Sequence, residues 1–183
     1  MKRESAVDFG GVQFRIVRRQ VKYTRIIYRK KDPVAIIPPG VSPRGVFEQN
    51  RERITRKIDA FRQAVQEAAR LKVWHYSPEK FDSLLAGALA DHSRYLGVEV
   101  REVKLRKMKR RWGTCYSDGK IILNRTICLL PPRLISFIVF HELLHMRFRN
   151  HGREFREAIR RRFPDYRDIN RSFRLYGLRL LGD

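Results

Sequence analysis

The segment LISFIVFHELLHMRF (residues 134–148) constrains the fold more than any other part of the sequence. Apolar side chains occupy almost every position, so a helix here would be apolar on all of its faces. Such a helix is stable only where other parts of the chain surround it. Pro131 and Pro132 favour a helix start, and Asn150 or Gly152 can end it. We therefore expect a buried central helix.

Two histidines and a glutamate interrupt this apolar segment in the pattern H-E-x-x-H: His141, Glu142 and His145. Residues i and i+4 share one face of a helix, so both imidazoles can bind one metal ion. Zinc lowers the pKa of a water molecule, and Glu142 can then take its proton. The motif predicts a zinc-dependent hydrolase with Glu142 as the general base. The alternative is a pair of core histidines bonded to backbone carbonyls, with Glu142 as a surface charge. Buried imidazoles and a buried carboxylate without partners would be costly, which favours the metal site.

A catalytic zinc site needs a third protein ligand and an open position. His151 is the best candidate, because it follows His145 by six residues and comes after a chain reversal near residues 149–150. Glu154 and Glu157 compete with it as carboxylate ligands. Imidazole is the commoner metal ligand, which favours His151. Manganese, cobalt or nickel could occupy the same ligand set in place of zinc.

The N-terminal residues predict a small sheet followed by helices. Apolar residues alternate in residues 11–18, and residues 22–29 and 33–37 are further strand candidates, so we expect an antiparallel meander. Ser42 and Ser77 each precede a proline, a pair typical of a helix N-cap and first turn. Four helices are expected around the central one: residues 43–71, 78–96, 153–163 and 165–176.

The stretch before the central helix predicts a β-hairpin. Residues 98–116 are extended in character, Asp118-Gly119 is a strong hairpin turn, and residues 120–124 (KIILN) supply the returning strand.

Four segments together resemble the YgjP-like metallopeptidase-fold family, which shares a zincin-like core with SprT and its relatives: RWGTC (111–115), IILN (121–124), HELLH (141–145) and NHGREF (150–155). The resemblance is strong over roughly residues 95–175. Thr114 and Gly152 stand where the family usually has serine, and Leu144 stands where alanine is common, all mild departures.

The resemblance implies an α+β, zincin-like fold with N-terminal antiparallel strands, a long helix, and a hairpin packed beside the HExxH helix. Residues 1–41 would form the N-terminal strands and residues 42–183 the helical, zincin-like hydrolase region, with both in one compact domain. It also implies zinc bound by His141, His145 and His151, with Glu142 as the base. An edge strand of the hairpin could then pair with an extended substrate.

The chain carries a formal net charge of +22 and a pI near 11.0, which favours polyanionic partners. Basic residues are dense in 101–111 and 147–162, on both sides of the motif. The alternative is a solvated charged face without a role in the site. From these stretches we select four candidate phosphate-binding residues: Arg110, Arg111, Arg149 and Arg153.

Some members of the family are labelled peptidases and others are described as UTP pyrophosphatases. The positive charge around the motif favours hydrolysis of a nucleoside triphosphate such as UTP to release pyrophosphate. One alternative is a zinc metallopeptidase, associated with DNA in the manner of SprT. Another is a non-catalytic nucleic-acid-binding module with a structural zinc, which would not need Glu142.

Three residues are candidates for supporting roles. Trp112 is expected chiefly in packing, Asn124 could brace the central helix, and Tyr166 could stabilise charge in the transition state, as could Tyr176. Cys115 is not expected to act as a nucleophile, because the metal already activates water.

Two cysteines without a CxxC spacing do not make a disulfide framework, so a reducing cytoplasm is the expected compartment. No apolar run is long enough to span a membrane, and the N-terminus lacks the apolar stretch of a secretory signal. We expect a nucleotide or another polyanion as substrate, nucleic acid as a further partner, and no membrane association.

Overall fold

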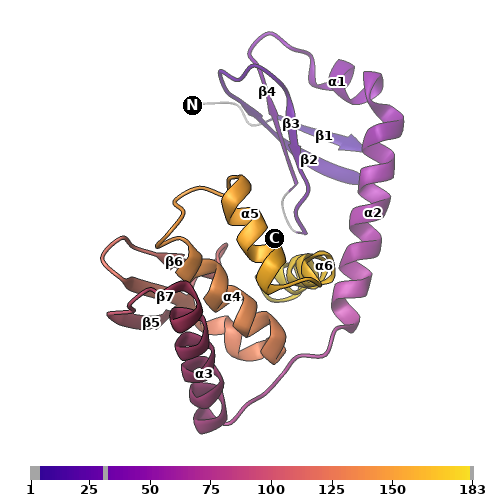
Figure 1. Ribbon diagram of the computed structural model, residues 1–183. Helices are drawn as coiled ribbons and strands as arrows, with labels where there is room; N and C mark the ends of the chain where they lie inside the picture. The colour runs from indigo at the N-terminus through magenta and orange to yellow at the C-terminus, as the bar shows by residue number, and fades with distance from the viewer. Residues whose placement is uncertain (1–4, 31–32, 182–183) are drawn as a thin grey trace. The chain divides into compact units, whose positions relative to one another are not determined.

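The computed structural model describes residues 5–30 and 33–181. They form an α+β protein, as predicted, with two compact units. Residues 1–71 and 177–183 make up the first unit and residues 72–176 the second (Figure 1). The positions of the two units relative to each other are not defined, and each unit is described separately.

The first unit contains a four-stranded sheet in the order β1-β2-β4-β3. Its strands are β1 (Ser5–Phe9), β2 (Val12–Arg18), β3 (Arg25–Ile27) and β4 (Val34–Ile37). The β3–β4 pair is antiparallel, as the predicted meander requires, and β1, which the sequence did not predict, pairs antiparallel with β2. Strands β2 and β4 are parallel. They are parallel because the chain first forms β3 at the edge of the sheet and then returns as β4 between β2 and β3. Alternation of apolar residues along a strand carries no information about this order.

The long helix expected after Ser42 is two helices, α1 (Pro43–Gln49) and α2 (Arg51–Arg70). Ser42 caps α1 as predicted, since its hydroxyl accepts from the Gly45 N–H at 3.2 Å. The helix breaks at Asn50, whose φ of −116° and ψ of 20° are not helical. The Asn50 side-chain amide donates to the Val46 carbonyl at 2.9 Å, so the junction satisfies part of its own backbone.

Helix α2 packs on the four-stranded sheet. Ile54 and Ile58 of α2 are buried against Phe14 and Phe47 in one apolar cluster. The C-terminal turn η2 (Gly177–Leu181) also contacts α2, and Arg179 donates to the Ala68 carbonyl at 3.4 Å. Compact packing therefore groups residues 43–70 with the N-terminal strands, whereas the sequence analysis drew its boundary after residue 41.

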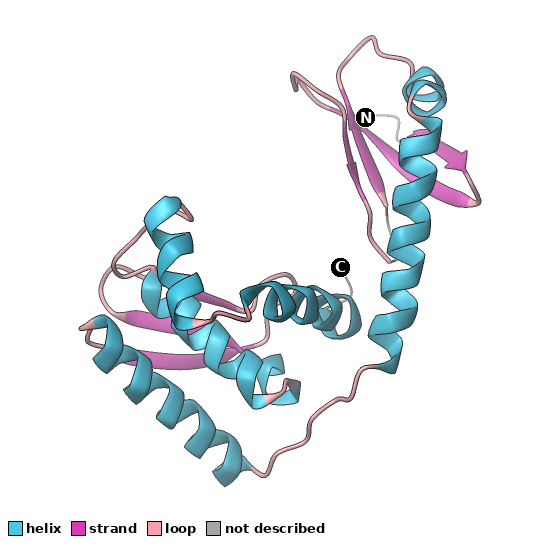
Figure 2. Ribbon diagram, turned by 45° about the vertical axis from the view of Figure 1, so that its right-hand side comes forward, coloured by secondary structure: helices cyan, strands magenta, loops and turns pink. Residues whose placement is uncertain are grey.

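The second unit contains a three-stranded sheet in the order β5-β7-β6 (Figure 1). Figure 2 shows the strands of this unit in magenta among its cyan helices. Its strands are β5 (Glu102–Arg106), β6 (Gly113–Cys115) and β7 (Lys120–Asn124). Strands β6 and β7 form the predicted antiparallel hairpin, and Gly119 in its turn has the positive φ of 85° that glycine favours. Strand β5 pairs with β7 in parallel, so β6 lies at an edge of the sheet.

Helix α4 (Pro132–Leu144) is the buried central helix that the sequence predicts. It ends earlier than expected, because His145 is its C-cap and the chain then tightens into turns. The N–H groups of Met146 and Arg147 donate to the carbonyls three residues earlier, at 3.0 and 3.1 Å. The HExxH motif therefore occupies the last turn of α4, where the chain can fold back toward it. Two helices follow, α5 (Arg153–Arg162) and α6 (Tyr166–Tyr176).

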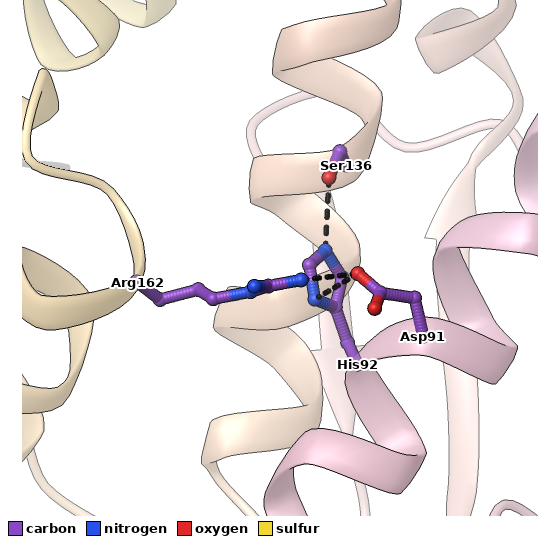
Figure 3. Close-up of polar contacts among 4 residues, drawn as sticks. All are labelled: Asp91, His92, Ser136 and Arg162. Atoms are coloured by element: carbon purple, nitrogen blue, oxygen red, sulfur yellow. Dashed lines mark hydrogen bonds and ion pairs between the residues drawn. The ribbon is translucent and has the colours of Figure 1, made fainter.

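Three helices of the second unit meet at a buried histidine (Figure 3). His92 of α3 (Pro78–Leu96) is 1% exposed, and its Nε2 lies 2.8 Å from the Ser136 hydroxyl of α4. Asp91, also on α3, forms an ion pair with Arg162 of α5 and lies 3.4 Å from Nδ1 of His92. Burial, reinforced by the Arg162 charge, lowers the pKa of His92 to about 4, although Asp91 opposes the shift. The buried imidazole is thus neutral near pH 7.

Candidate metal centre

Three imidazoles converge at the end of α4. His141 comes from its last turn, His145 is its C-cap, and His151 comes from the loop before α5. Their candidate ligand atoms all lie within 4.8 Å of one another, and Nε2 of His141 is 3.1 Å from Nε2 of His151. The structure therefore brings together the three histidines that the sequence selected. Within the described ranges, Glu154 and Glu157 are not part of this group.

The geometry of the three imidazoles fits a divalent transition metal. Zinc–nitrogen bonds of about 2.0–2.1 Å place two ligands of a tetrahedron roughly 3.3 Å apart, close to the observed separation. Nδ1 of His145 lies 3.1 Å from the Phe148 carbonyl, which orients the ring with Nε2 toward the centre. Burial and the two neighbouring imidazoles lower the pKa of His141 to about 4. His141 is therefore unprotonated near pH 7, as a metal ligand must be.

Phe155 of α5 supports all three imidazoles from one side. Its ring centroid lies 5.1, 4.9 and 4.6 Å from those of His141, His145 and His151, and the residue is 1% exposed. The sequence analysis quoted Phe155 only as the last letter of NHGREF. The available signal was its position four residues after His151, at the start of the next helix.

Glu142 is buried beside the histidines, with 7% of its surface exposed. Burial raises the pKa of its carboxyl to about 7, and the charge of Arg111 opposes the rise. The backbone of β6 passes directly over it: a Cβ at Gly113 would lie 2.6 Å from Cγ of Glu142. Gly113 belongs to the RWGTC segment (111–115), and nothing in its sequence context predicted this close approach.

A cleft of about 860 Å³ opens over the imidazoles, and we call it the metal cleft. Strand β6 lines it on one side, together with Glu142 and three arginines: Arg111, Arg147 and Arg149. Glu142 is the one acidic residue in this lining. Burial, Glu142 and Asp118 raise the pKa of the Cys115 thiol, which also lines the cleft, to about 11. A protonated thiol suits the expectation that Cys115 is not a nucleophile.

The other candidate phosphate-binding arginines lie apart from the metal cleft. Arg153 is an exposed residue that pairs with Glu157 at 2.7 Å, and it does not line the cleft. Arg110 lines a separate cavity of about 280 Å³, which also reaches Arg111 and Glu142. Arg111 and Arg149 are thus the two candidates that face the metal cleft.

The supporting residues take different positions. Trp112 is buried and packs on Phe173, with ring centroids 5.4 Å apart. Tyr166 lines the smaller cavity with His141 and Glu142, whereas Tyr176 is buried and donates to the Lys72 carbonyl at 2.7 Å.

Asn124 was expected to brace α4, but its side-chain hydrogen bonds go to the loop before β6 and to the turn after β7. Its amide donates to the carbonyls of Met108 and Arg111, both at 2.8 Å, and its oxygen accepts from the Thr126 N–H at 3.2 Å. Asn124 is fully buried at the end of β7, directly opposite the loop that leads into β6. It therefore fixes the segment that delivers Arg111 to the metal cleft.

The YgjP-like, metallopeptidase domain family matches the chain over residues 25–176. The chain belongs to the YgjP-like family. The match covers most of this YgjP-like protein and includes the three histidines, Glu142 and the hairpin. Membership makes it a metallopeptidase-like protein and a candidate hydrolase, and implies a divalent metal, typically zinc.

Two solved structures are similar to this YgjP-like protein. The metallopeptidase zymogen jannalysin of Methanocaldococcus jannaschii is 20% identical, with a TM-score of 0.45 over 49% of this chain and 86% of that chain. The metallopeptidase zymogen abylysin of Pyrococcus abyssi is 22% identical, with a TM-score of 0.46 over 52% and 94%. No curated protein sequence matches this YgjP-like protein. Among its described helices, none combines the length and apolar character needed to cross a bilayer.

Proposed function

We propose that this YgjP-like protein is a zinc-dependent peptidase that cleaves an extended chain bound along β6. The observation that carries the proposal is the contact between the edge strand and the general base. Because β6 has β7 on one side only, its other edge can pair with an added strand. Such a strand would run across the metal cleft beside Glu142.

In this proposal His141, His145 and His151 hold the zinc ion, which when bound supplies Lewis acidity and lowers the pKa of water. Glu142 takes a proton from the attacking water and delivers it to the leaving amine. Its pKa near 7 in the protein without metal suits a group that must both accept and release a proton. Strand β6 holds the substrate backbone through main-chain hydrogen bonds.

A second candidate is the hydrolysis of a nucleoside triphosphate such as UTP, which the sequence analysis put first. Arg111, Arg147 and Arg149 line the metal cleft and would neutralise a polyphosphate. Arg147 is partly committed to the fold, because its guanidinium donates to the Leu96 carbonyl at 3.0 Å. An open strand edge binds an extended peptide through main-chain hydrogen bonds, which a nucleotide cannot form. For this reason we favour peptide hydrolysis.

One pair of assays separates the two candidates. Zinc-loaded protein is incubated with unfolded casein and, separately, with each ribonucleoside triphosphate, and Glu142→Gln serves as the control in both. Peptide cleavage that needs Glu142, without pyrophosphate release, supports the peptidase. Release of pyrophosphate that needs Glu142, with casein intact, replaces it with the second candidate. If the original protein and Glu142→Gln show equal rates on every substrate, both candidate functions are contradicted.

A further inference from the structure

A second polar groove lies in the first unit, between β3 and the junction of α1 and α2. Its volume is about 370 Å³, and it contains no metal-ligating cluster among the described residues. The polar residues of its lining come from the sheet edge, the α1–α2 junction and α2: Thr24, Tyr28, Gln49, Asn50, Arg53 and Lys57. We call it the α2 groove. It has room for roughly a dozen water molecules, enough for a small charged group and part of what carries it.

The charges of the α2 groove all have one sign. Arg53 and Lys57 are exposed and one helical turn apart, so both project on the same side of α2. Neither forms an ion pair with any residue that the structure describes, although other basic residues of the same helix do, such as Arg51 with Glu48 and Arg62 with Asp59. No acidic residue belongs to the lining. Two unpaired cations facing one groove are suited to an anion.

The hydroxyl of Tyr28 is a second feature of the α2 groove that points to a bound ligand. Its oxygen is buried and has no hydrogen-bond partner among the described residues. A buried hydroxyl without a partner is destabilising, so a native protein normally satisfies it. Burial raises the pKa of Tyr28, and the charge of Arg53 acts against the rise, which shows that the guanidinium lies near the ring.

We propose that the α2 groove binds a phosphate group, with Arg53, Lys57 and the Tyr28 hydroxyl as its donors. Arg53 offers a planar pair of N–H groups, Lys57 a compact charge, and Tyr28 an O–H without an acceptor in the part of the chain that the structure describes. The Thr24 hydroxyl and the Asn50 amide also line the groove and can complete the shell. The site is built within the first unit, so it does not depend on the metal centre or on the proposed peptidase activity.

The phosphate can belong to a nucleic-acid backbone or to a free polyphosphate, and two probes separate these sources. The zinc-loaded full chain is titrated with a labelled DNA duplex of about 20 base pairs and with inorganic tripolyphosphate, over a range of salt concentrations. The test variant is Arg53→Gln/Lys57→Gln. The matched control is Arg56→Gln/Arg70→Gln, which removes two exposed charges from the same helix away from the groove.

We expect the groove variant to raise the Kd of at least one probe about tenfold or more and to flatten its salt dependence by roughly two charges. The control should change the Kd by less than about threefold, as expected from general charge alone. An effect confined to DNA identifies the backbone as the source, and one confined to tripolyphosphate identifies a free polyphosphate. Equal losses in the groove and control variants, for both probes, would overturn the proposal.

Tyr28→Phe provides an independent check, since it removes only an oxygen. Because that oxygen has no partner among residues 5–30 and 33–181, the variant should unfold at the same temperature or higher, and it should still bind the sensitive probe more weakly. Unchanged affinity would remove the hydroxyl from the site.

Discussion

Gly113 lies against Glu142 so closely that a methyl group at position 113 would be 2.6 Å from Cγ and 2.8 Å from Oε1 of the carboxylate side chain. The φ angle of Gly113 is not positive, so backbone conformation does not require glycine there. The requirement is space, because the backbone of β6 and the Glu142 side chain lie too close together to leave room for a Cβ. In the proposed peptidase, this contact would link the position of a substrate on β6 to the position of Glu142.

Gly113→Ala should therefore displace Glu142 while the histidines stay in place. We expect stoichiometric zinc binding and a loss of about a hundredfold in kcat, as for a displaced general base. Metal analysis and steady-state kinetics on the substrate that proves active measure the two effects. Thr114→Ala, one residue along the same strand, is the control. If Gly113→Ala retains the full rate, the contact has no part in catalysis.

Glu142→Gln should keep the metal and the fold and lose about a hundredfold or more in rate, because the amide cannot accept a proton from water. The substitution preserves the shape of a side chain that is 7% exposed. Zinc content and the circular dichroism spectrum should match those of the original protein. A variant with an unchanged rate would exclude Glu142 as the base.

His145→Ala should lose tight zinc binding, since two imidazoles alone make an incomplete site. His75→Ala is a suitable control, because His75 is exposed and lies outside the three-histidine group. Dialysis against a zinc buffer followed by metal analysis gives the stoichiometry. Full retention of zinc by the His145 variant would show that the ligand assignment is wrong.

The neutral state of His92 predicts how stability depends on pH. Its pKa falls from 6.5 in the unfolded chain to about 4 in the folded protein, so between these values the unfolded state binds more protons. Stability should drop as the pH falls from 6.5 to 4, by about 3 kcal/mol for this group. His92→Asn should flatten that part of the profile in urea unfolding at several pH values. Parallel profiles for the two proteins would contradict the shift.

Asn124→Ala should destabilise the protein by about 2–3 kcal/mol, because it removes both hydrogen bonds to the carbonyls of Met108 and Arg111 in a buried site. Asn170→Ala, at an exposed position, should change stability little. Urea unfolding of both variants measures the difference. A cost near zero for Asn124→Ala would mean that the loop before β6 is held by other contacts.

The metal site was predictable from the sequence because its spacing is local. His141 and His145 share a helix face by periodicity alone, and His151 is close enough in sequence to return after a turn. The hairpin was also predictable, since Asp118-Gly119 defines its turn. The contacts of Gly113 and Asn124 were harder to predict, because their partners are set by packing between segments that are distant in sequence.

The order of the N-terminal strands shows the same limit. Each strand except β1 could be recognised from its own residues, but the parallel pairing of β2 with β4 depends on which neighbour each strand finds. The break at Asn50 is similar. The apolar stripe of α1 and α2 continues across it, with Phe47 and Ile54 in one core, so the hydrophobic pattern alone reads as a single helix.

The edge strand β6 spans only Gly113–Cys115, and arginines surround it in the cleft. An open strand edge is normally a hazard, because a second copy of the same chain can add to it and begin an aggregate. Here two such copies would bring together molecules that each carry a charge of +22. The positive charge therefore opposes the pairing of two copies of this protein at β6. It would not oppose the approach of chains of lower or opposite charge.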